Sequence, residues 1–319
     1  MSYYRQAFGL RSEPFHVTPD PAFLFLTPQH REALAGLAYA ISERKGFAIL
    51  TGPAGTGKTT LARKVLQGTH ASAVESSVVL NPALSVAEFL EAVLLDFGIR
   101  EIPASKAQRI WIFQKFLLNS HRQGRVAALL VDEAHKMTPE LIEEVRLWSN
   151  FEFGDEKLLQ IILVGQKELL NVIERPELGQ FKQRIVLRLA LGPLEKSEVG
   201  AYLRHRWAKA GGGDTLPFAE EAVERIAYVS GGIPRVINTV ADNALLLAFG
   251  QGAATVEATH ITGAAMELGL PLAFPKVVVI PPPPDRAAHS LRTLESYGSR
   301  PGWWSRFTAR TGRLAGSRI

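Results

Sequence analysis

The stretch FAILTGPAGTGKTTLARKVL, residues 47–66, decides the fold of this chain. It begins as a short apolar strand, passes through a glycine-rich loop and continues as a pattern typical of a helix. The loop fits the spacing G-x-x-x-x-G-K-[ST] at Gly52, Gly57, Lys58 and Thr59. Backbone N–H groups of such a loop can turn inward around phosphate oxygens, and the helix N-terminus adds partial positive charge. The stretch therefore predicts a phosphate-binding loop, and the alternative is a plain glycine-rich turn.

The loop pattern also assigns roles to single side chains. Lys58 is expected to reach the β and γ phosphates of ATP, and the hydroxyl of Thr59 is expected to bind Mg²⁺. The residues expected to contact the nucleotide from this loop are Gly52, Pro53, Ala54, Gly55, Thr56, Gly57, Lys58, Thr59 and Thr60.

A second apolar run, LLVDEAH at 129–135, ends in the adjacent carboxylates Asp132 and Glu133. Beside a phosphate loop, this pattern predicts that Asp132 holds Mg²⁺ and that Glu133 orients and deprotonates the attacking water. The alternative is a solvated strand end. The letters DEAH also name a helicase family, whose enzymes need a second ATPase-like lobe of about 150 further residues. After Pro193 the sequence shows only helical patterns and a tail, so we reject the helicase interpretation.

Further apolar runs alternate with helical patterns along the chain. Ser85 and Glu88 form a capping-box pattern, and Thr138-Pro139 predicts a capped helix start. Strands are expected at 47–52, 76–81, 125–131, 158–165 and 184–192. The alternation predicts an α/β fold, a P-loop parallel sheet sandwiched by helices. We expect three parts, namely an α/β domain at 1–193, a small all-helical domain at 194–270, and a disordered proline-rich linker with a basic aromatic tail at 271–319.

Composition narrows the function classes. With 46% hydrophobic and 21% charged residues, the chain has the composition of an ordinary globular protein. It contains no cysteine, which excludes disulfides, thiolate zinc sites and cysteine catalysis. Neither a secretory signal nor an apolar run of about 20 residues is recognisable, so a cytoplasmic location is expected. His30, His135 and His260 match no metal-ligand spacing, and we expect ordinary surface or core histidines.

The net charge of +5 belongs to the tail, because 285–319 contains seven Arg against two acidic residues and the rest of the chain is formally neutral. Three interpretations of this tail stay open: attachment to an anionic membrane surface, nucleic-acid binding, or a solvated end without a partner. The residues concerned are Trp303, Trp304 and Phe307 with Arg300, Arg306, Arg310, Arg313 and Arg318.

The motifs together resemble an AAA+ ATPase. They are the phosphate loop, VDEAH, a polar residue after IILVG, an Arg before the last strand, and GGIPR in the helical region. More narrowly, the chain resembles the general secretion pathway protein A (ExeA-like) ATPases over about residues 3–270. The segments that carry this likeness are YYRQAFGLRSEPFHVTPDPAFLF, HREALAGLAYAI, LLQIILVGQKEL and GGIPRVINTVADNALL.

This resemblance implies further site residues. Gln166 matches the position called sensor 1, where a polar side chain lies near the γ-phosphate and the attacking water. It could instead cap the following helix. Arg184 matches the arginine finger that reaches a neighbouring subunit's nucleotide. The alternatives are that Arg184 is an ordinary surface residue or that Arg188 has this role. Arg235 matches the position called sensor 2, which lies on the small all-helical domain at 194–270, the lid domain of such ATPases. The region of Pro14 and Phe15 is expected near the adenine.

The resemblance implies an oligomeric, Mg²⁺-dependent ATPase that drives assembly of a secretion, pilus or polysaccharide-export apparatus at the inner membrane. The alternative is an ATP-gated nucleic-acid-binding regulator of the DNA transposition type, but the neutral body of the chain argues against it. A third alternative is a scaffold that binds ATP without turnover. Longer family members carry a transmembrane helix and a peptidoglycan-binding module after the ATPase. The chain ends soon after the proline run, so no direct peptidoglycan-binding module is expected.

Overall fold

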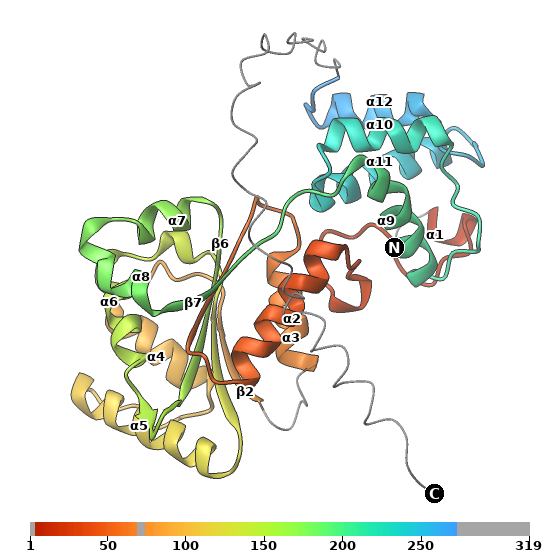
Figure 1. The fold of residues 1–319 in the computed structure, drawn as a ribbon. Coiled ribbons are helices and arrows are strands. Elements are labelled where there is room, and N and C mark those ends of the chain that lie inside the picture. Colours follow the sequence, from red (N-terminus) through yellow and green to blue (C-terminus); the bar gives the residue numbers. More distant parts are fainter. Residues whose placement is uncertain (1–3, 69–73, 273–319) are drawn as a thin grey trace, which may run out of the picture. The chain divides into compact units, whose positions relative to one another are not determined.

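Apolar segments far apart in the sequence become parallel strands of one sheet (Figure 1). The computed structural model describes residues 4–68 and 74–272, and Met1–Ala273 form one compact unit. The predicted tail beyond 272, with its Trp and Arg residues, lies outside the described part. Within the described part the sheet has five strands in the order β2-β3-β6-β1-β7. The strands are β1 (Phe47–Thr51), β2 (Val74–Val79), β3 (Val126–Val131), β6 (Leu159–Gly165) and β7 (Ile185–Ala190).

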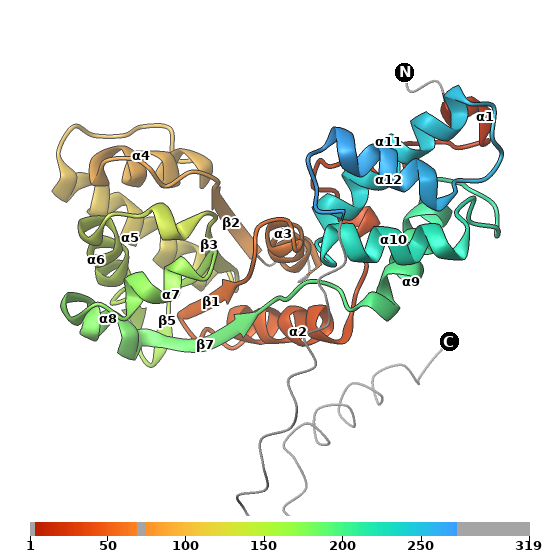
Figure 2. The same cartoon turned by 90° about the horizontal axis from the view of Figure 1, so that it is seen from above.

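The two faces of the sheet are covered by different helices, as the view from above shows (Figure 2). Alternate residues of β1 make this possible: Phe47 and Ile49 face one apolar cluster, and Ala48 and Leu50 face the other. The second cluster is filled by α2 (Pro28–Ser42) and α3 (Lys58–Gly68). The first is filled by α4 (Val86–Asp96), α5 (Lys106–Arg122), α6 (Pro139–Trp148), α7 (Glu168–Ile173) and α8 (Gly179–Arg184). The predicted α/β fold is confirmed.

The predicted helix starts are formed by the expected caps. Ser85 Oγ accepts from the backbone N–H of Glu88, whose carboxylate accepts from the N–H of Ser85. Thr138 caps α6 in the same way by accepting from the N–H of Leu141. A short antiparallel pair, β4 (Glu152–Phe153) and β5 (Glu156–Lys157), was not predicted.

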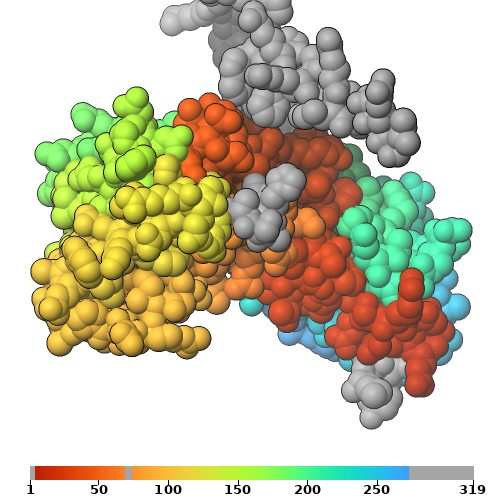
Figure 3. All heavy atoms as spheres, turned by 90° about the horizontal axis from the view of Figure 1, so that it is seen from below, coloured from red at the N-terminus to blue at the C-terminus, as the bar shows by residue number. Residues whose placement is uncertain are grey.

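Between β7 and residue 272 the chain is mainly helical, with α9 (Lys196–Lys209), α10 (Glu220–Ser230), α11 (Pro234–Gly250) and α12 (Ala258–Glu267). Their shared core also takes in residues from the other end of the chain, including Tyr4 of α1 (Tyr4–Ala7), Phe15, and Phe23 of the short 3-10 helix η1 (Pro21–Phe23). In the space-filling view, the red N-terminal segment lies against these green-to-cyan helices (Figure 3). The expected domain boundaries at 193 and 270 stay predictions.

No helix in the described ranges, 4–68 and 74–272, is both long and apolar enough to cross a bilayer.

Candidate nucleotide-binding site

The predicted phosphate loop connects β1 to α3 at the carboxyl edge of the sheet. Gly55 has φ +80°, and a Cβ placed there would lie only 2.7 Å from the Cβ of Arg235 at the start of α11. The backbone N–H of Arg235 donates to the carbonyl of Gly55 at 3.2 Å. The predicted sensor 2 residue therefore begins the helix that touches the tip of the loop.

Lys58 is the first residue of α3 and is buried. Its ammonium donates to the carbonyl of Pro53 at 2.8 Å, across the turn of the loop. Burial lowers the pKa of Lys58, and the nearby charges of Asp132 and Glu133 oppose this effect. The site thus keeps a desolvated ammonium next to the loop amides, where phosphate charge would stabilise its charged form.

Thr59 of α3 and Asp132, which directly follows β3, are brought together although 73 positions separate them in the chain. The Thr59 hydroxyl donates to Oδ2 of Asp132 at 2.6 Å, and the other carboxylate oxygen accepts from the N–H of Glu133 at 2.9 Å. A hydroxyl and a buried carboxylate supply the hard oxygen ligands that Mg²⁺ prefers. The residues predicted to hold the metal therefore fit it.

Glu133 adopts the left-handed conformation, with φ +51°. This region is costly for a residue with a Cβ, and such strain often lies at functional sites. Its carboxylate lies 3.4 Å from Nε2 of His135 and 3.5 Å from the ammonium of Lys136. Glu133 also lines the pocket described below, so the predicted base is placed at the site.

Gln166 follows β6 directly, at the same sheet edge as Asp132 and the loop. Its backbone N–H donates to Nδ1 of His135 at 3.4 Å, so His135 lies between Gln166 and Glu133. The helix that follows has Lys167 as its N-cap, without a side-chain cap bond. The capping role considered for Gln166 is therefore not what the structure shows.

Arg184 lies at the opposite edge of the sheet. It ends α8, and the next residue, Ile185, pairs with Phe47 at the beginning of β1. Since each strand residue advances about 3.3 Å, β1 separates the two edges by about 15 Å. Arg184 is thus not brought together with the loop of its own chain. Its competitor Arg188 pairs with Ile49 in the middle of β7 and is exposed.

A cavity of about 450 Å³ extends from the loop to the helical part of the chain. The loop residues Ala54 to Thr60 form one wall, and Arg235 and Asn238 of α11 form another. Residues 16–20 of the N-terminal segment also line it, whereas Pro14 and Phe15 are not among its lining residues. The lining of the cavity therefore begins at His16, directly after the two residues expected near the adenine.

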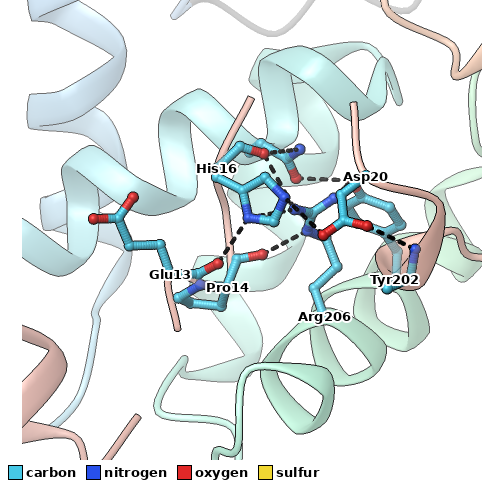
Figure 4. A network of polar contacts seen from close by, with 8 residues as sticks. Glu13, Pro14, His16, Asp20, Tyr202 and Arg206 are labelled. Carbon is cyan, nitrogen blue, oxygen red and sulfur yellow. Dashed lines mark hydrogen bonds and ion pairs between the residues drawn. The ribbon is translucent and has the colours of Figure 1, made fainter. Parts of the chain in front are cut away.

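Arg206 of α9, which also lines the cavity, holds this N-terminal segment by hydrogen bonds (Figure 4). Its Nε donates to the carbonyl of Pro14 at 2.6 Å, and Nη2 donates to the carbonyl of His16 at 3.1 Å. The guanidinium is buried and lies over the rings of Phe23 and Tyr202, with its carbon 5.0 Å and 5.9 Å from their centroids. The side chain thus fixes the backbone that leads into the cavity wall.

Two polar residues of the helices complete this network. The hydroxyl of Tyr202 donates to Oδ1 of Asn238 at 2.7 Å, and Nδ2 of Asn238 lies 3.4 Å from the carbonyl of His16. Burial raises the pKa of Tyr202, so its hydroxyl stays a donor. Sequence reasoning missed Arg206 and Tyr202, which belong to no local motif, and Asn238, which lies three positions after Arg235 in the segment GGIPRVINTVADNALL.

Residues 41–173 match the family model described as AAA domain. The chain is 38% identical over 269 residues to General secretion pathway protein A of Aeromonas hydrophila. Over the aligned residues the chain is similar to the ExeA-like AAA+ ATPases. The alignment covers 83% of this ExeA-like chain and 48% of that relative, so the chain spans about half the length of the curated relative.

Solved structures support the fold of this ExeA-like protein. The ORC2 protein of Aeropyrum pernix, in its ADPNP-ADP complexes, matches with a TM-score of 0.61 at 17% identity over 78% of this chain and 72% of that chain. Cdc6p of Pyrobaculum aerophilum matches with a TM-score of 0.62 at 15% identity over 78% and 70% of the two chains. At these identities the likeness concerns the fold alone.

Proposed function

We propose that this ExeA-like AAA+ protein binds Mg·ATP and hydrolyses it. The observation that carries the proposal is the 2.6 Å contact between the Thr59 hydroxyl and the Asp132 carboxylate, beside the buried ammonium of Lys58. An ammonium, a hydroxyl and a carboxylate at the edge of a phosphate loop are the groups that a nucleoside triphosphate with Mg²⁺ requires.

Each side chain has a separate task in this proposal. Thr59 and Asp132 would hold Mg²⁺, which when bound neutralises charge on the β and γ phosphates. Lys58 would bind those phosphates in the ground state, since its ammonium already lies within the loop. Glu133 would accept a proton from the attacking water, and Gln166 would orient that water near the γ-phosphate. Arg235 would bind phosphate from the lid side of the cavity.

We further propose that the protein works as an oligomer. Arg184 lies about 15 Å, the length of β1, from the loop of its own chain, so we infer that it would act on the nucleotide of a neighbouring subunit. An arginine supplied in trans would stabilise transition-state charge on the phosphates. The α/β and lid domains, with boundaries at 193 and 270, would then be the parts whose relative movement nucleotide binding controls.

The biological role is proposed from the relative. General secretion pathway protein A of Aeromonas hydrophila is similar over most of this chain, and its name places it in a secretion pathway. We propose that ATP turnover here drives assembly of a secretion, pilus or polysaccharide-export apparatus, with attachment at the inner membrane. The partner and the membrane contact are inferences from this similarity and from the basic aromatic tail.

Phosphate release and nucleotide affinity in two variants test the proposed activity. Lys58→Ala should lose ATP binding, because the ammonium contacts ground-state phosphates. Glu133→Gln should bind ATP as the wild type does but release little phosphate, because the amide cannot accept the proton. Unchanged turnover in Glu133→Gln would disprove the assigned base. Turnover that requires added DNA would instead favour the transposition-type regulator.

A further inference from the structure

His30 lies under the phosphate loop, although no sequence motif assigns it a role there. It is the third residue of α2 and is only 4% exposed. A Cβ added to Gly57 of the loop would lie 3.6 Å from Nε2 of His30. The imidazole therefore occupies the space between the start of α2 and the loop.

The contacts of His30 determine which nitrogen carries the proton. The hydroxyl oxygen of Thr27, the N-cap of α2, accepts from the backbone N–H of His30 at 3.3 Å and lies 2.7 Å from Nδ1. The Thr27 hydroxyl is then free to donate its own hydrogen to Nδ1. Nε2 lies 3.3 Å from the carbonyl of Thr56, an acceptor only, so Nε2 carries the hydrogen.

We propose that His30 is a positioning residue that sets the orientation of the Thr56–Gly57 peptide for phosphate binding. This inference rests on the proposed nucleotide-binding function. The Thr56–Gly57 peptide is trans, as are the peptide bonds of all described residues. In a planar trans peptide the C=O and N–H groups point in opposite directions. A bond from His30 to the Thr56 carbonyl therefore turns the Gly57 N–H away from the ring, as a donor to phosphate.

The loop needs this support because its glycines restrain the backbone conformation only weakly. Gly57 has φ +92°, a region that glycine enters at low cost but also leaves at low cost. The Thr56 hydroxyl donates to the carbonyl of Pro53 at 3.0 Å, which fixes the side chain of Thr56 but not its carbonyl. His30 supplies the missing restraint on the peptide plane.

His30 is itself rigidly held. α2 packs against α3 and the sheet through buried residues such as Leu37, Ile41 and Leu61. Burial lowers the pKa of His30, which favours the neutral ring that the Thr27 contact requires. α3, which follows the loop, and α2, which carries His30, share one apolar core.

The experiment compares affinities for ADP and for adenosine in the full chain. The phosphates of ADP would accept hydrogen bonds from the backbone N–H groups of the loop, whereas adenosine has no phosphate. His30→Leu should weaken ADP binding about tenfold, as expected for one lost hydrogen bond, and leave adenosine binding unchanged. His30→Gln keeps a donor at the Nε2 position and should bind ADP within about twofold of the wild type.

His260→Leu is the matched control. His260 is also a buried histidine at the third position of a helix, α12, where Nδ1 accepts from the N–H of Glu257 at 2.9 Å. It does not line the cavity, so its loss should leave ADP affinity unchanged. An equal loss of ADP affinity in His260→Leu and His30→Leu would show a general effect of stability and overturn the proposal.

Other outcomes are also decisive. ADP binding by a folded His30→Leu at wild-type strength, or equal loss of ADP and adenosine, would overturn the proposal. If His30→Leu does not fold, the ADP affinities of His30→Asn and His30→Gln are compared instead. The Asn side chain is too short to reach the Thr56 carbonyl, so His30→Asn should bind ADP more weakly than His30→Gln. Equal ADP affinities of these two variants would refute the role of His30. A wild-type chain that binds no ADP would refute the proposed nucleotide site and this inference with it.

Discussion

The hydroxyl of Thr59 donates to the carboxylate of Asp132 at 2.6 Å and so joins the first turn of α3 to the end of β3. If these two oxygens hold Mg²⁺, Asp132→Asn should raise the Mg²⁺ concentration that half-saturates ATP turnover by about 10- to 100-fold. The amide keeps the shape and an acceptor oxygen but loses the charge. Titration of phosphate release with MgCl₂ measures this shift.

Asp155→Asn is the control for the charge change, because Asp155 is exposed between β4 and β5. It should leave the Mg²⁺ requirement as in the wild type. An Asp132→Asn enzyme with the wild-type Mg²⁺ dependence would remove Asp132 from the metal site.

The position of Arg184 at the far edge of the sheet predicts complementation between subunits. Arg184→Ala should lower turnover by at least about 10³-fold, the effect of losing an arginine finger. Mixing it with Lys58→Ala subunits should restore part of the activity, because an interface can then combine an intact loop with an intact Arg184. Phosphate release from the mixture, compared with each variant alone, tests this.

Arg188→Ala serves as the comparison, since Arg188 is exposed in the middle of β7. Normal turnover of Arg184→Ala at every protein concentration would reject Arg184 as the finger and make Arg188 the next candidate.

Much of the sheet could be predicted because strands buried on both faces appear as continuous apolar runs. The residues of β3 and β6 are buried almost throughout, and both strands were expected within one residue of their observed ends. Local caps such as Ser85 were also predictable, because the partners lie three positions apart.

Contacts between distant segments could be predicted where motifs link them, as for Thr59 and Asp132, but not elsewhere. The bond from Arg206 to Pro14 joins residues 192 positions apart, and neither has a pattern that points to the other. The left-handed conformation of Glu133 and the contact of His30 with Thr56 likewise depend on how the helices pack. The sequence TPQH does contain a capping signal, which could have indicated an ordered His30 but not its loop contact.

Arg206 lines the cavity, and its buried hydrogen bonds also predict an effect on stability. Arg206→Met keeps the length of the side chain but leaves the carbonyls of Pro14 and His16 without these donors. The free energy of unfolding should fall by about 2–4 kcal/mol, the cost of leaving buried acceptors unpaired. Arg204→Met, on the exposed face of the same helix, should change it by less than about 0.5 kcal/mol. Denaturant unfolding of both variants measures the difference, and equal effects would contradict the role of Arg206.

His30 predicts a pH dependence of stability. Burial lowers its pKa below the ordinary value of 6.5, although the hydrogen bond with the Thr56 carbonyl and the charge of Glu198 oppose this effect. Below pH 6.5 the unfolded chain therefore binds a proton that the folded chain does not, and stability falls as the pH decreases until the lowered pKa is reached. A single such proton contributes at most about 1.4 kcal/mol per pH unit.

His30→Gln removes this proton, so its free energy of unfolding should fall less steeply than that of the wild type below pH 6.5. The difference between the two proteins isolates His30 from other titrating groups, among them His205, whose pKa burial also lowers. Parallel pH profiles would show that His30 titrates normally in the folded chain.

The contact between the loop and α11 predicts that Gly55→Ala weakens ATP binding. The new Cβ would lie 2.7 Å from the Cβ of Arg235, so the start of α11 would have to move away from the loop. Gly98→Ala is the matched control, because Gly98 has a similar φ of +86° but no atom within 4 Å of the added Cβ. Both variants should lose about 1–3 kcal/mol of stability through backbone strain, as measured by denaturant unfolding. Only Gly55→Ala should also lose ATP affinity, since only there does the methyl group separate two parts of the cavity wall. If Gly98→Ala weakens ATP binding to the same degree, strain alone accounts for the loss, and the contact of Gly55 with Arg235 has no part in nucleotide binding.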